Sequence, residues 1–389
     1  NDVRNMLAPY SPSSVEKRLG LKGKTIQKVA KELWANRGKS VVYAEGSANK
    51  TVNGVALHLA THFLNTILGN VGETIDFEYS YGKQDLGSFK SLVSLIADMK
   101  SGNVSAVFTY KTNPSYFLPN ASEFNGALAK VKTVVSLDDR ITETGKHADY
   151  LLPTSHSLES WGDREFINGK YTVVQPTISP LWNTRQFEES LMHIATVAGS
   201  TAFVNKKGAV IDSYDLVRMV WKDMHKALKS NKTFDRFWID FVRDGVVDTI
   251  SDREASHKAY AFNTRAFNGL KVETAAKGLT LSVFVGSQVH DGSQNNNPYL
   301  LECPDPVSKV TWDNFLAVSN AFAKQHNLEI TNDKNDLVEI EVGGTRHVLP
   351  FNIQPGQRDD VVTVAAGWGR TSGGLVADGD QDADGNYLG

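Results

Sequence analysis

This 389-residue chain has a single cysteine, Cys303, and the shortage of thiols limits its chemistry. One cysteine cannot form a disulfide within the chain. It also cannot supply the several thiolates that an iron–sulfur cluster or a structural zinc site takes from one polypeptide. A thiolate-bound metal centre of either kind would need ligands from another part or another chain.

Long apolar runs and an excess of one charge are also lacking. No apolar run approaches the ~20 residues that span a bilayer, and the first residues, NDVRNMLAPYSPSS, lack the order of a signal peptide. Basic residues number 41 and acidic residues 44, so the total charge points neither to nucleic acid nor to an anionic membrane as the main partner. The missing initiator methionine leads us to expect a processed chain or a piece of a longer one.

The familiar nucleotide fingerprints are absent. Gly46 follows the β-branched run SVVYAEG and precedes a helical pattern, but GSANKTVNG is not G-x-G-x-x-G, and no P-loop occurs. An NAD or ATP site of the usual kind is therefore disfavoured. Backbone amides at this helix start could hold a phosphate, and a plain tight turn is an equal alternative.

One segment, TETGKHADYLLPTSHSLESWGD, concentrates polar side chains. Its histidines, His147 and His156, are nine residues apart and lack the H-E-x-x-H spacing of a zinc helix, and no G-x-S-x-G elbow marks a serine nucleophile. A polar loop that is solvated or bonded to itself is favoured over a metal site. The acidic tail DGDQDADGNYLG begins like a calcium loop but ends before its last ligand, so a solvated turn is favoured there too.

The patterns that are present alternate between strand and helix. A helix is expected over residues 15–37, a strand over 40–46 and a helix over 51–72, and the alternation recurs in SFKSLVSLIADMKSG, SAVFTYKTNP and TVVSLDD. Such alternation predicts an α/β fold with a parallel sheet, and ligands bind beyond the carboxyl ends of its strands. Those ends fall at residues 44–47, 110–114 and 137–140.

The predicted secondary structure then changes twice along the sequence. From about residue 190 to 252 it is helical, and the aromatic residues of FDRFWIDF are interpreted as the core face of a helix. After about residue 269, short β-rich runs separated by turns suggest a small barrel or sandwich with one inserted helix. We therefore expect an α/β domain over 1–200, a mostly helical connection over 201–270 and a β domain over 271–389.

The order of motifs resembles the molybdopterin oxidoreductase superfamily. VFTYKTNPSYFLPN is followed by VVSLDDRITETGKHADYLLPTSHSLESWGD, QPTISPLW, NNNPYLLECPDPVSKVTWDN and a β-rich end with GWGR. Within the superfamily, the chain is similar to the molybdopterin-like subunit of alternative complex III, a quinol-oxidising respiratory complex of bacteria. The resemblance implies a Rossmann-like dinucleotide-type domain followed by a double-psi-like β-barrel that covers the cofactor.

The same resemblance implies cofactor-wall roles for particular residues. In that superfamily a strand-end N-P, a strand that ends in Asp and a T-x-x-x-A-D-x-x-L-P run surround a pterin dinucleotide. These features, with the glycine turn and the L-E-x-W-G-D signature, map onto Gly46, Asn113, Pro114, Asp138, Thr144, Asp149, Pro153 and Glu159. No catalytic residue or protein ligand to a metal is implied in this chain.

The resemblance also leads us to expect a particular function. Relatives in complex III are understood to lack the cofactor, so we expect a domain of a quinol-oxidising respiratory complex that binds no molybdenum cofactor and is not catalytic alone. Its expected partners are an iron–sulfur domain or subunit that carries the clusters, cytochrome c and membrane subunits, at the periplasmic side of the bacterial inner membrane. Two alternatives stay open: the molybdopterin guanine dinucleotide-binding part of a true molybdenum enzyme of the polysulfide or thiosulfate reductase type, and a nucleotide-binding module.

Overall fold

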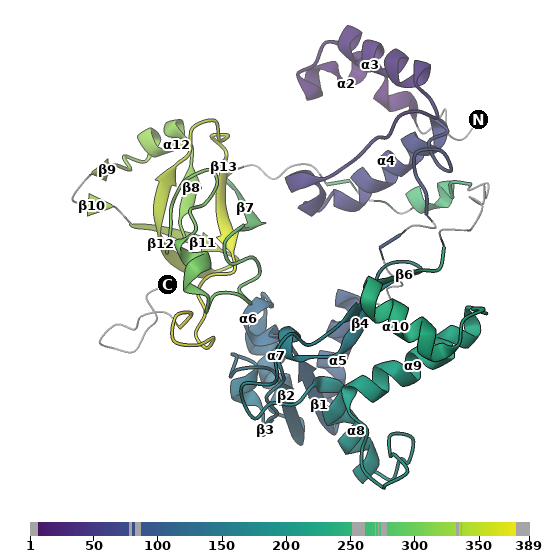
Figure 1. Ribbon diagram of the computed structural model, residues 1–389. Coiled ribbons are helices and arrows are strands. Elements are labelled where there is room, and N and C mark those ends of the chain that lie inside the picture. The colour runs from purple at the N-terminus through teal and green to yellow at the C-terminus, as the bar shows by residue number, and fades with distance from the viewer. Residues whose placement is uncertain are drawn as a thin grey trace. The chain divides into compact units, whose positions relative to one another are not determined.

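The computed structural model describes residues 7–77, 80–81, 87–250, 261–268, 270, 272–273, 278–331, 334–335 and 337–378. The chain divides into two compact units (Figure 1). Unit 1 comprises residues 1–83, 167–169 and 250–275, and unit 2 comprises 84–166, 170–249 and 276–389. Of the residues to which the sequence assigns a cofactor role, Gly46 falls in unit 1 and the others fall in unit 2. The acidic tail turn with Asp380, Asp382 and Asp384 lies outside the described residues.

Unit 1 is built from helices. The single helix expected over residues 15–37 is wrong, because the chain turns at Gly20, whose φ of 63° ends one helix before a second begins. Glycine adopts this left-handed conformation without a Cβ clash, so it caps the first helix. The helix expected over 51–72 is confirmed. The elements are η1 (Ala8–Tyr10), α2 (Pro12–Leu19), α3 (Gly23–Ala35), η2 (Gly46–Lys50), α4 (Gly54–Ile67) and η5 (Thr264–Phe267).

The strand expected at residues 40–46 does not form. The stretch before Gly46 has no strand partner, and the side chain of Asn65 on α4 binds its backbone instead. Asn65 Oδ1 accepts the Val42 amide at 2.9 Å, and Asn65 Nδ2 donates to the Val42 carbonyl at 2.8 Å. A side-chain amide thus satisfies the donor and acceptor that a neighbouring strand would otherwise satisfy.

Unit 2 contains the predicted parallel sheet. β1 (Ala106–Tyr110) pairs in parallel with β2 (Thr133–Leu137), which pairs in parallel with β3 (Tyr150–Leu151). Helices α5 (Phe89–Lys100) and α7 (Ala121–Leu128) pack beside β1 and β2, and Met99, Leu128 and Val134 are buried between them. A short helix, α6 (Pro114–Phe117), leaves the end of β1. We call residues 87–161 the α/β region.

A helical part follows the α/β region. Its helices are α8 (Phe187–Val197), α9 (Ser213–Ala227) and α10 (Phe234–Asp244), and its three-stranded sheet has the order β4 (Gly162–Ile167), β5 (Lys170–Val174), β6 (Val246–Asp248). Trp221, Trp238 and Phe241 are buried in one cluster. The interpretation of the FDRFWIDF aromatics as a helix core face is therefore confirmed for Trp238 and Phe241, which are 4% and 2% exposed.

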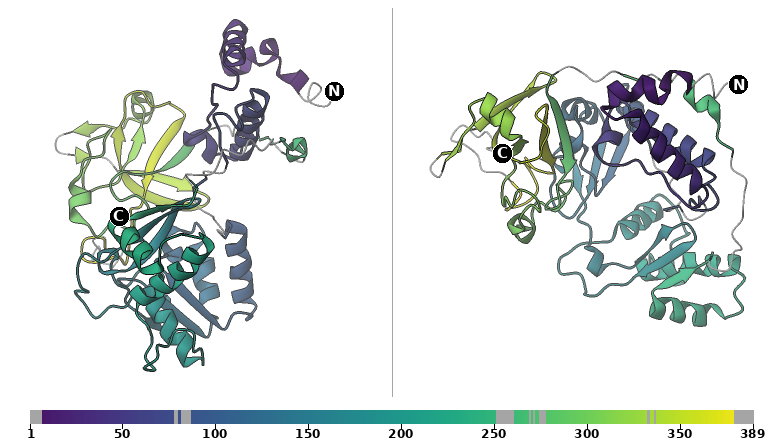
Figure 2. Two further views of the ribbon diagram at one scale, coloured as in Figure 1. Left: turned by 45° about the vertical axis from the view of Figure 1, so that its right-hand side comes forward. Right: turned by 90° about the horizontal axis from the view of Figure 1, so that it is seen from above.

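The C-terminal β region, residues 278–378, forms a five-stranded mixed sheet, coloured green to yellow in Figure 2. The strand order is β11-β12-β8-β13-β7, in which β12–β8 and β13–β7 are parallel pairs. Buried Leu316, Val318 and Val362 form its core. The elements are β7 (Thr280–Val285), α11 (Pro298–Glu302), β8 (Leu316–Val318), α12 (Asn320–Gln325), β9 (Ile330–Thr331), β10 (Lys334–Asn335), β11 (Leu337–Val342), β12 (Thr345–Ile353) and β13 (Val361–Ala366).

Candidate functional site

The loops after β1 and β2 meet at the carboxyl edge of the parallel sheet and are bonded to each other. Asn113, three residues after the end of β1, donates through Nδ2 to Glu143 Oε2 at 2.7 Å. Its Oδ1 accepts both the backbone N–H of Thr144 at 3.0 Å and the Thr144 hydroxyl at 2.8 Å. Thr144 Oγ1 in turn accepts the Ser115 amide at 3.0 Å. Thr144 is 1% exposed, so these bonds fix both loops in place.

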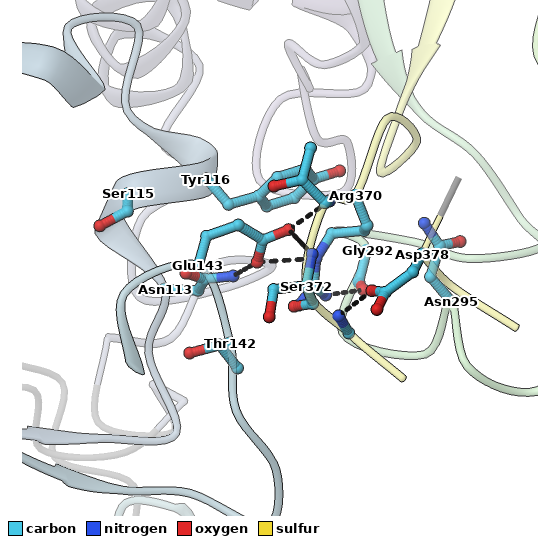
Figure 3. A network of polar contacts seen from close by, with 12 residues as sticks. Asn113, Ser115, Tyr116, Thr142, Glu143, Gly292, Asn295, Arg370, Ser372 and Asp378 are labelled. Atoms are coloured by element: carbon cyan, nitrogen blue, oxygen red, sulfur yellow. Dashed lines mark hydrogen bonds and ion pairs between the residues drawn. The ribbon is translucent and has the colours of Figure 1, made fainter. Parts of the chain in front are cut away.

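A buried ion pair joins these loops to the C-terminal β region (Figure 3). Arg370 Nε donates to Glu143 Oε1 at 2.9 Å, and the two side chains are 5% and 10% exposed. The backbone amides of Thr371 and Ser372 donate to the same oxygen, at 2.7 and 3.0 Å. Arg370 also donates to the carbonyl of Gly292 at 2.6 Å. With so many bonds, the two buried charges are well compensated, as such pairs must be.

Tyr116, on α6, adds an aromatic wall to this contact. Its ring lies under the Arg370 guanidinium, 4.9 Å from the ring centre, and its hydroxyl donates to the Trp368 carbonyl at 2.8 Å. Burial raises the pKa of Tyr116 to about 12, although the Arg370 charge acts in the opposite direction. Tyr116 is therefore a neutral donor at any physiological pH. We call Asn113, Tyr116, Glu143, Thr144 and Arg370 the clasp.

A cavity of about 480 Å³ lies beside the clasp. This volume is within the ~300–1,000 Å³ range of small-molecule sites. Polar and charged side chains dominate its wall, and they come from the loops after β1 and β2, from the polar segment and from the C-terminal β region. They include Lys111, Asn113, Asp138, Asp139, Arg140, His156, Asp291, Gln294 and Arg370.

The carboxylates of the cavity differ in their surroundings. Burial is the largest effect on Asp138 and raises its pKa, which favours the protonated form. Burial also opposes the ionisation of Asp139. The hydrogen bond and the charge of the Arg140 guanidinium, whose Nε lies 2.8 Å from Asp139 Oδ1, together outweigh burial, and the pKa of Asp139 is lowered. The pKa values of these two neighbouring carboxyl groups are thus shifted in opposite directions.

A second cavity of about 280 Å³ adjoins the first. Its wall includes Tyr110 and Phe187, together with Trp161 and Arg164. The rings of Tyr110 and Phe187 are stacked, with 4.0 Å between their centres. Lys111 and Ser157 line both cavities, so the two spaces meet at these residues.

The residues expected to form a cofactor wall divide into two groups in unit 2. Asn113 and Asp138 line the larger cavity. The others brace the surrounding backbone: Thr144 holds Asn113, Pro114 begins α6, and Asp149 Oδ2 accepts the Val134 amide at 2.7 Å. The Pro153 carbonyl accepts the Arg185 amide, and Glu159 accepts the amides of His156 and Leu181. Gly46, in unit 1, is exposed with a φ of 82°.

Glu143, Arg370 and Lys111 were not singled out by the sequence motifs. Arg370 stands in the GWGR stretch that contributed to the resemblance, and Lys111 immediately precedes the strand-end TNP, so proximity to a motif was the available signal. Among the described residues, no group of three or more His, Cys, Asp or Glu side chains is arranged to hold a metal ion. No helix in that part of the chain is both long and apolar enough to cross a bilayer.

Polar loops at the carboxyl edge of a parallel sheet, closed by a second β region, are the features of a ligand-binding α/β protein. Residues 81–187 match the molybdopterin oxidoreductase family model, so the chain carries a domain of this family. The matched stretch contains the loops after β1 and β2, and with them Asn113, Asp138 and Glu143.

Two curated relatives carry related names. The menaquinone reductase molybdopterin-binding-like subunit of Nitratidesulfovibrio vulgaris is 26% identical over 218 residues, which is 50% of this chain and 30% of that protein. The arsenate respiratory reductase molybdopterin-containing subunit ArrA of Shewanella sp. strain ANA-3 is 24% identical over 234 residues, which is 48% of this chain and 27% of that protein. The chain therefore spans less than a third of the length of either relative.

A solved structure supports the fold. Acetylene hydratase from Pelobacter acetylenicus superposes with a TM-score of 0.51 at 14% identity, over 76% of this chain and 41% of that one. At this identity the likeness concerns the fold alone.

The expectation that this chain binds no cofactor is wrong. A molybdopterin oxidoreductase domain implies molybdopterin binding, and the names of both curated relatives refer to molybdopterin. The cavity suits such a group, because amide and carboxyl side chains can bond the N–H and C=O edges of a pterin or purine ring, and cationic side chains can face phosphate oxygens. Asn113, Asp138, Arg140 and Gln294 provide these groups on the wall.

Proposed function

We propose that this chain is the cofactor-binding part of a molybdopterin oxidoreductase-like subunit in a quinol-oxidising respiratory electron-transfer complex. The observation that carries the proposal is the 480 Å³ cavity at the carboxyl ends of β1 and β2, because the loops that follow these two strands belong to the stretch that matches the family model. The name of the menaquinone reductase relative supports the link to quinone. That relative is named as a subunit, which supports an assembly with partner chains.

The residues of this chain bind and orient rather than react. Asn113, on the cavity wall, is fixed by its hydrogen bonds to Glu143 and Thr144. Arg370 and Tyr116 join the loops to the C-terminal β region beside the cavity. When bound, the cofactor supplies a metal centre that exchanges electrons, and side chains alone have no such capacity.

Pterin and metal contents test the cofactor part of this proposal. The full-length protein is purified with its native complex and oxidised, and the released pterin is quantified by fluorescence beside molybdenum and tungsten by mass spectrometry. We expect pterin in near-stoichiometric amount. Repeated failure to find pterin in freshly purified native complex would rule out cofactor binding.

The respiratory part of the proposal needs its own measurement. Membranes from a strain that lacks this protein should oxidise added quinol more slowly, and the re-introduced gene should restore the rate. We also propose a peripheral position at the periplasmic side of the inner membrane, with an iron–sulfur subunit, cytochrome c and membrane subunits as partners. Protease accessibility in spheroplasts and affinity purification check the location and the partners; an unchanged quinol oxidation rate would exclude the respiratory role.

A further inference from the structure

Lys111 has a backbone conformation that lysine rarely adopts. It follows the last residue of β1 and has a φ of 43°, in the left-handed region. Here the side chain of a non-glycine residue crowds the backbone, which is unfavourable. A hydrogen bond supports this conformation: the Lys111 amide donates to the carbonyl of Leu137, the last residue of β2, at 3.2 Å. Backbone strain of this kind is concentrated at functional sites of proteins, so a strained residue on a cavity wall is a candidate for ligand binding.

The position of Lys111 is shared between the two cavities. The residue lines both the 480 Å³ and the 280 Å³ space, as Ser157 does. A ligand that extended from one cavity into the other would therefore pass Lys111. Because Lys111 lines both spaces, it lies where the two cavities adjoin.

The ammonium group of Lys111 forms no direct ion pair with a described residue. Its charge acts on the nearby Asp138 and Asp139, where it favours the ionised carboxylates, and Lys111 Nζ lies 5.9 Å from the centre of the Tyr110 ring. The other cations of the larger cavity are paired: Arg140 with Asp139 at 2.8 Å, and Arg370 with Glu143 at 2.9 Å. Asp138 and Asp291 also line that cavity, and neither carboxylate is in direct contact with Lys111, although the Lys111 charge acts to lower the pKa of Asp138.

We propose that Lys111 binds a phosphate-class anion of the ligand at the junction of the two cavities. The proposal rests on the proposed function and makes it more specific, because it assigns the anionic linker of a dinucleotide-type cofactor to one side chain. An ammonium without a carboxylate partner forms charge-assisted hydrogen bonds to phosphate oxygens. The Ser157 hydroxyl, on the same shared wall, is a second donor within the site.

Inorganic pyrophosphate titrated into the full chain at fixed, low ionic strength tests this assignment. We expect saturable binding by the wild type in calorimetry. The Lys111→Met variant should bind at least about tenfold more weakly, because one charge-assisted hydrogen bond is lost. The Lys111→Gly variant should weaken binding to the same extent while its melting temperature is unchanged or higher, because glycine accepts a positive φ without strain.

Lys229 provides a matched control. It is also an exposed lysine with a positive φ, 50°, and it lines neither cavity. Lys229→Met and Lys229→Gly remove the same charge and the same strain from unit 2, and should leave pyrophosphate affinity at the wild-type value. Equal weakening by the Lys111 and Lys229 variants would mean that only net charge matters, and would overturn the proposal.

Two further outcomes would also overturn it: no pyrophosphate binding by the wild type, or wild-type affinity in Lys111→Met. Pterin content separates this inference from the proposed function. A native complex that retains pterin, with unchanged pyrophosphate affinity in Lys111→Met, refutes the role of Lys111 and leaves the function standing. A complex without pterin whose chain still binds pyrophosphate through Lys111 refutes the function and keeps the anion site.

Discussion

At the scale of single residues, Glu143 connects the loop after β1 to the C-terminal β region. It receives hydrogen bonds from Asn113, from Arg370 and from the amides of Thr371 and Ser372. These donors lie on the loop after β1 and in the C-terminal β region. A single carboxylate therefore holds the walls of the cavity together.

Removing this carboxylate should destabilise unit 2 strongly. Glu143→Ala leaves the buried Arg370 guanidinium without its partner, which typically costs about 3–5 kcal/mol. Chemical denaturation followed by circular dichroism measures the loss. As a control, Arg358→Met removes an exposed ion pair with Asp360 in the same β region and should have little effect. Equal effects of the two substitutions would contradict the structural role of the clasp.

The pH dependence of stability should report the same carboxylate. Burial alone would raise the pKa of Glu143, but hydrogen bonds from Arg370, Asn113 and Thr371 outweigh it, and the pKa lies below its ordinary value of 4.5. The stabilisation is therefore present above pH 4.5 and is lost as the pH falls through the lowered pKa. The melting temperature of the wild type should exceed that of Glu143→Gln at pH 7, and the gap should narrow in acid. A gap that widens in acid would disprove the assignment.

Residues at strand ends were predictable from sequence, whereas the clasp was not. Asn113 and Asp138 directly follow β-rich runs, and the rule that ligands bind at the carboxyl ends of parallel strands locates them. Glu143 and Arg370 are 227 positions apart, and their contact depends on how the C-terminal β region packs against the α/β region. No local pattern encodes such a pairing.

At the scale of elements, helices α9 and α10 depend on one aromatic side chain. Trp221 is 1% exposed, contacts the rings of Tyr171 and Phe241, and donates from Nε1 to Asp163 at 2.7 Å. Trp221→Ala should cost about 3–5 kcal/mol, because it leaves a large cavity. Urea unfolding of unit 2 checks this value. Trp182 is 79% exposed, and its alanine variant should be neutral; a destabilising Trp182→Ala with a neutral Trp221→Ala would refute the packing.

The stretch before Gly46 shows why an element can be mispredicted. A β-branched run predicts an extended backbone, and the run SVVYAEG is extended at Glu45, but the pattern does not encode whether a strand partner exists. Here the Asn65 side chain forms the hydrogen bonds that a partner strand would form. Asn65 is 2% exposed and is hydrogen-bonded to Asn70. Helices with strong apolar periodicity, such as α4 and α5, were predicted correctly because their signal is local.

Loss of the Asn65 amide should therefore loosen this stretch. Asn65→Ala leaves the Val42 donor and acceptor unpaired at a cost of about 1–3 kcal/mol. Hydrogen exchange at the Val42 amide should be faster in the variant than in the wild type. Asn36, an exposed asparagine of unit 1, gives the matched control, and Asn36→Ala should leave exchange at Val42 unchanged. Unchanged exchange in Asn65→Ala would show that the side chain does not hold the backbone.

At the scale of the whole molecule, the wall of the larger cavity draws on distant parts of the sequence. The family model matches residues 81–187, but Asp291, Gln294 and Arg370 on the cavity wall come from the C-terminal β region. The order of short motifs predicted this combination of an α/β part and a β part. The Rossmann-like and double-psi-like forms stay predictions, because what the structure shows is a parallel sheet and a mixed sheet.

Hydrogen exchange of the native complex, with its pterin cofactor retained and after the cofactor is removed, tests whether the cofactor binds in the 480 Å³ cavity. We expect cofactor removal to accelerate exchange in peptides that contain Lys111–Asn113 and Asp138–Arg140, whereas peptides from α9 stay unchanged. Unchanged exchange at both loops, with acceleration elsewhere, would place the cofactor outside this cavity.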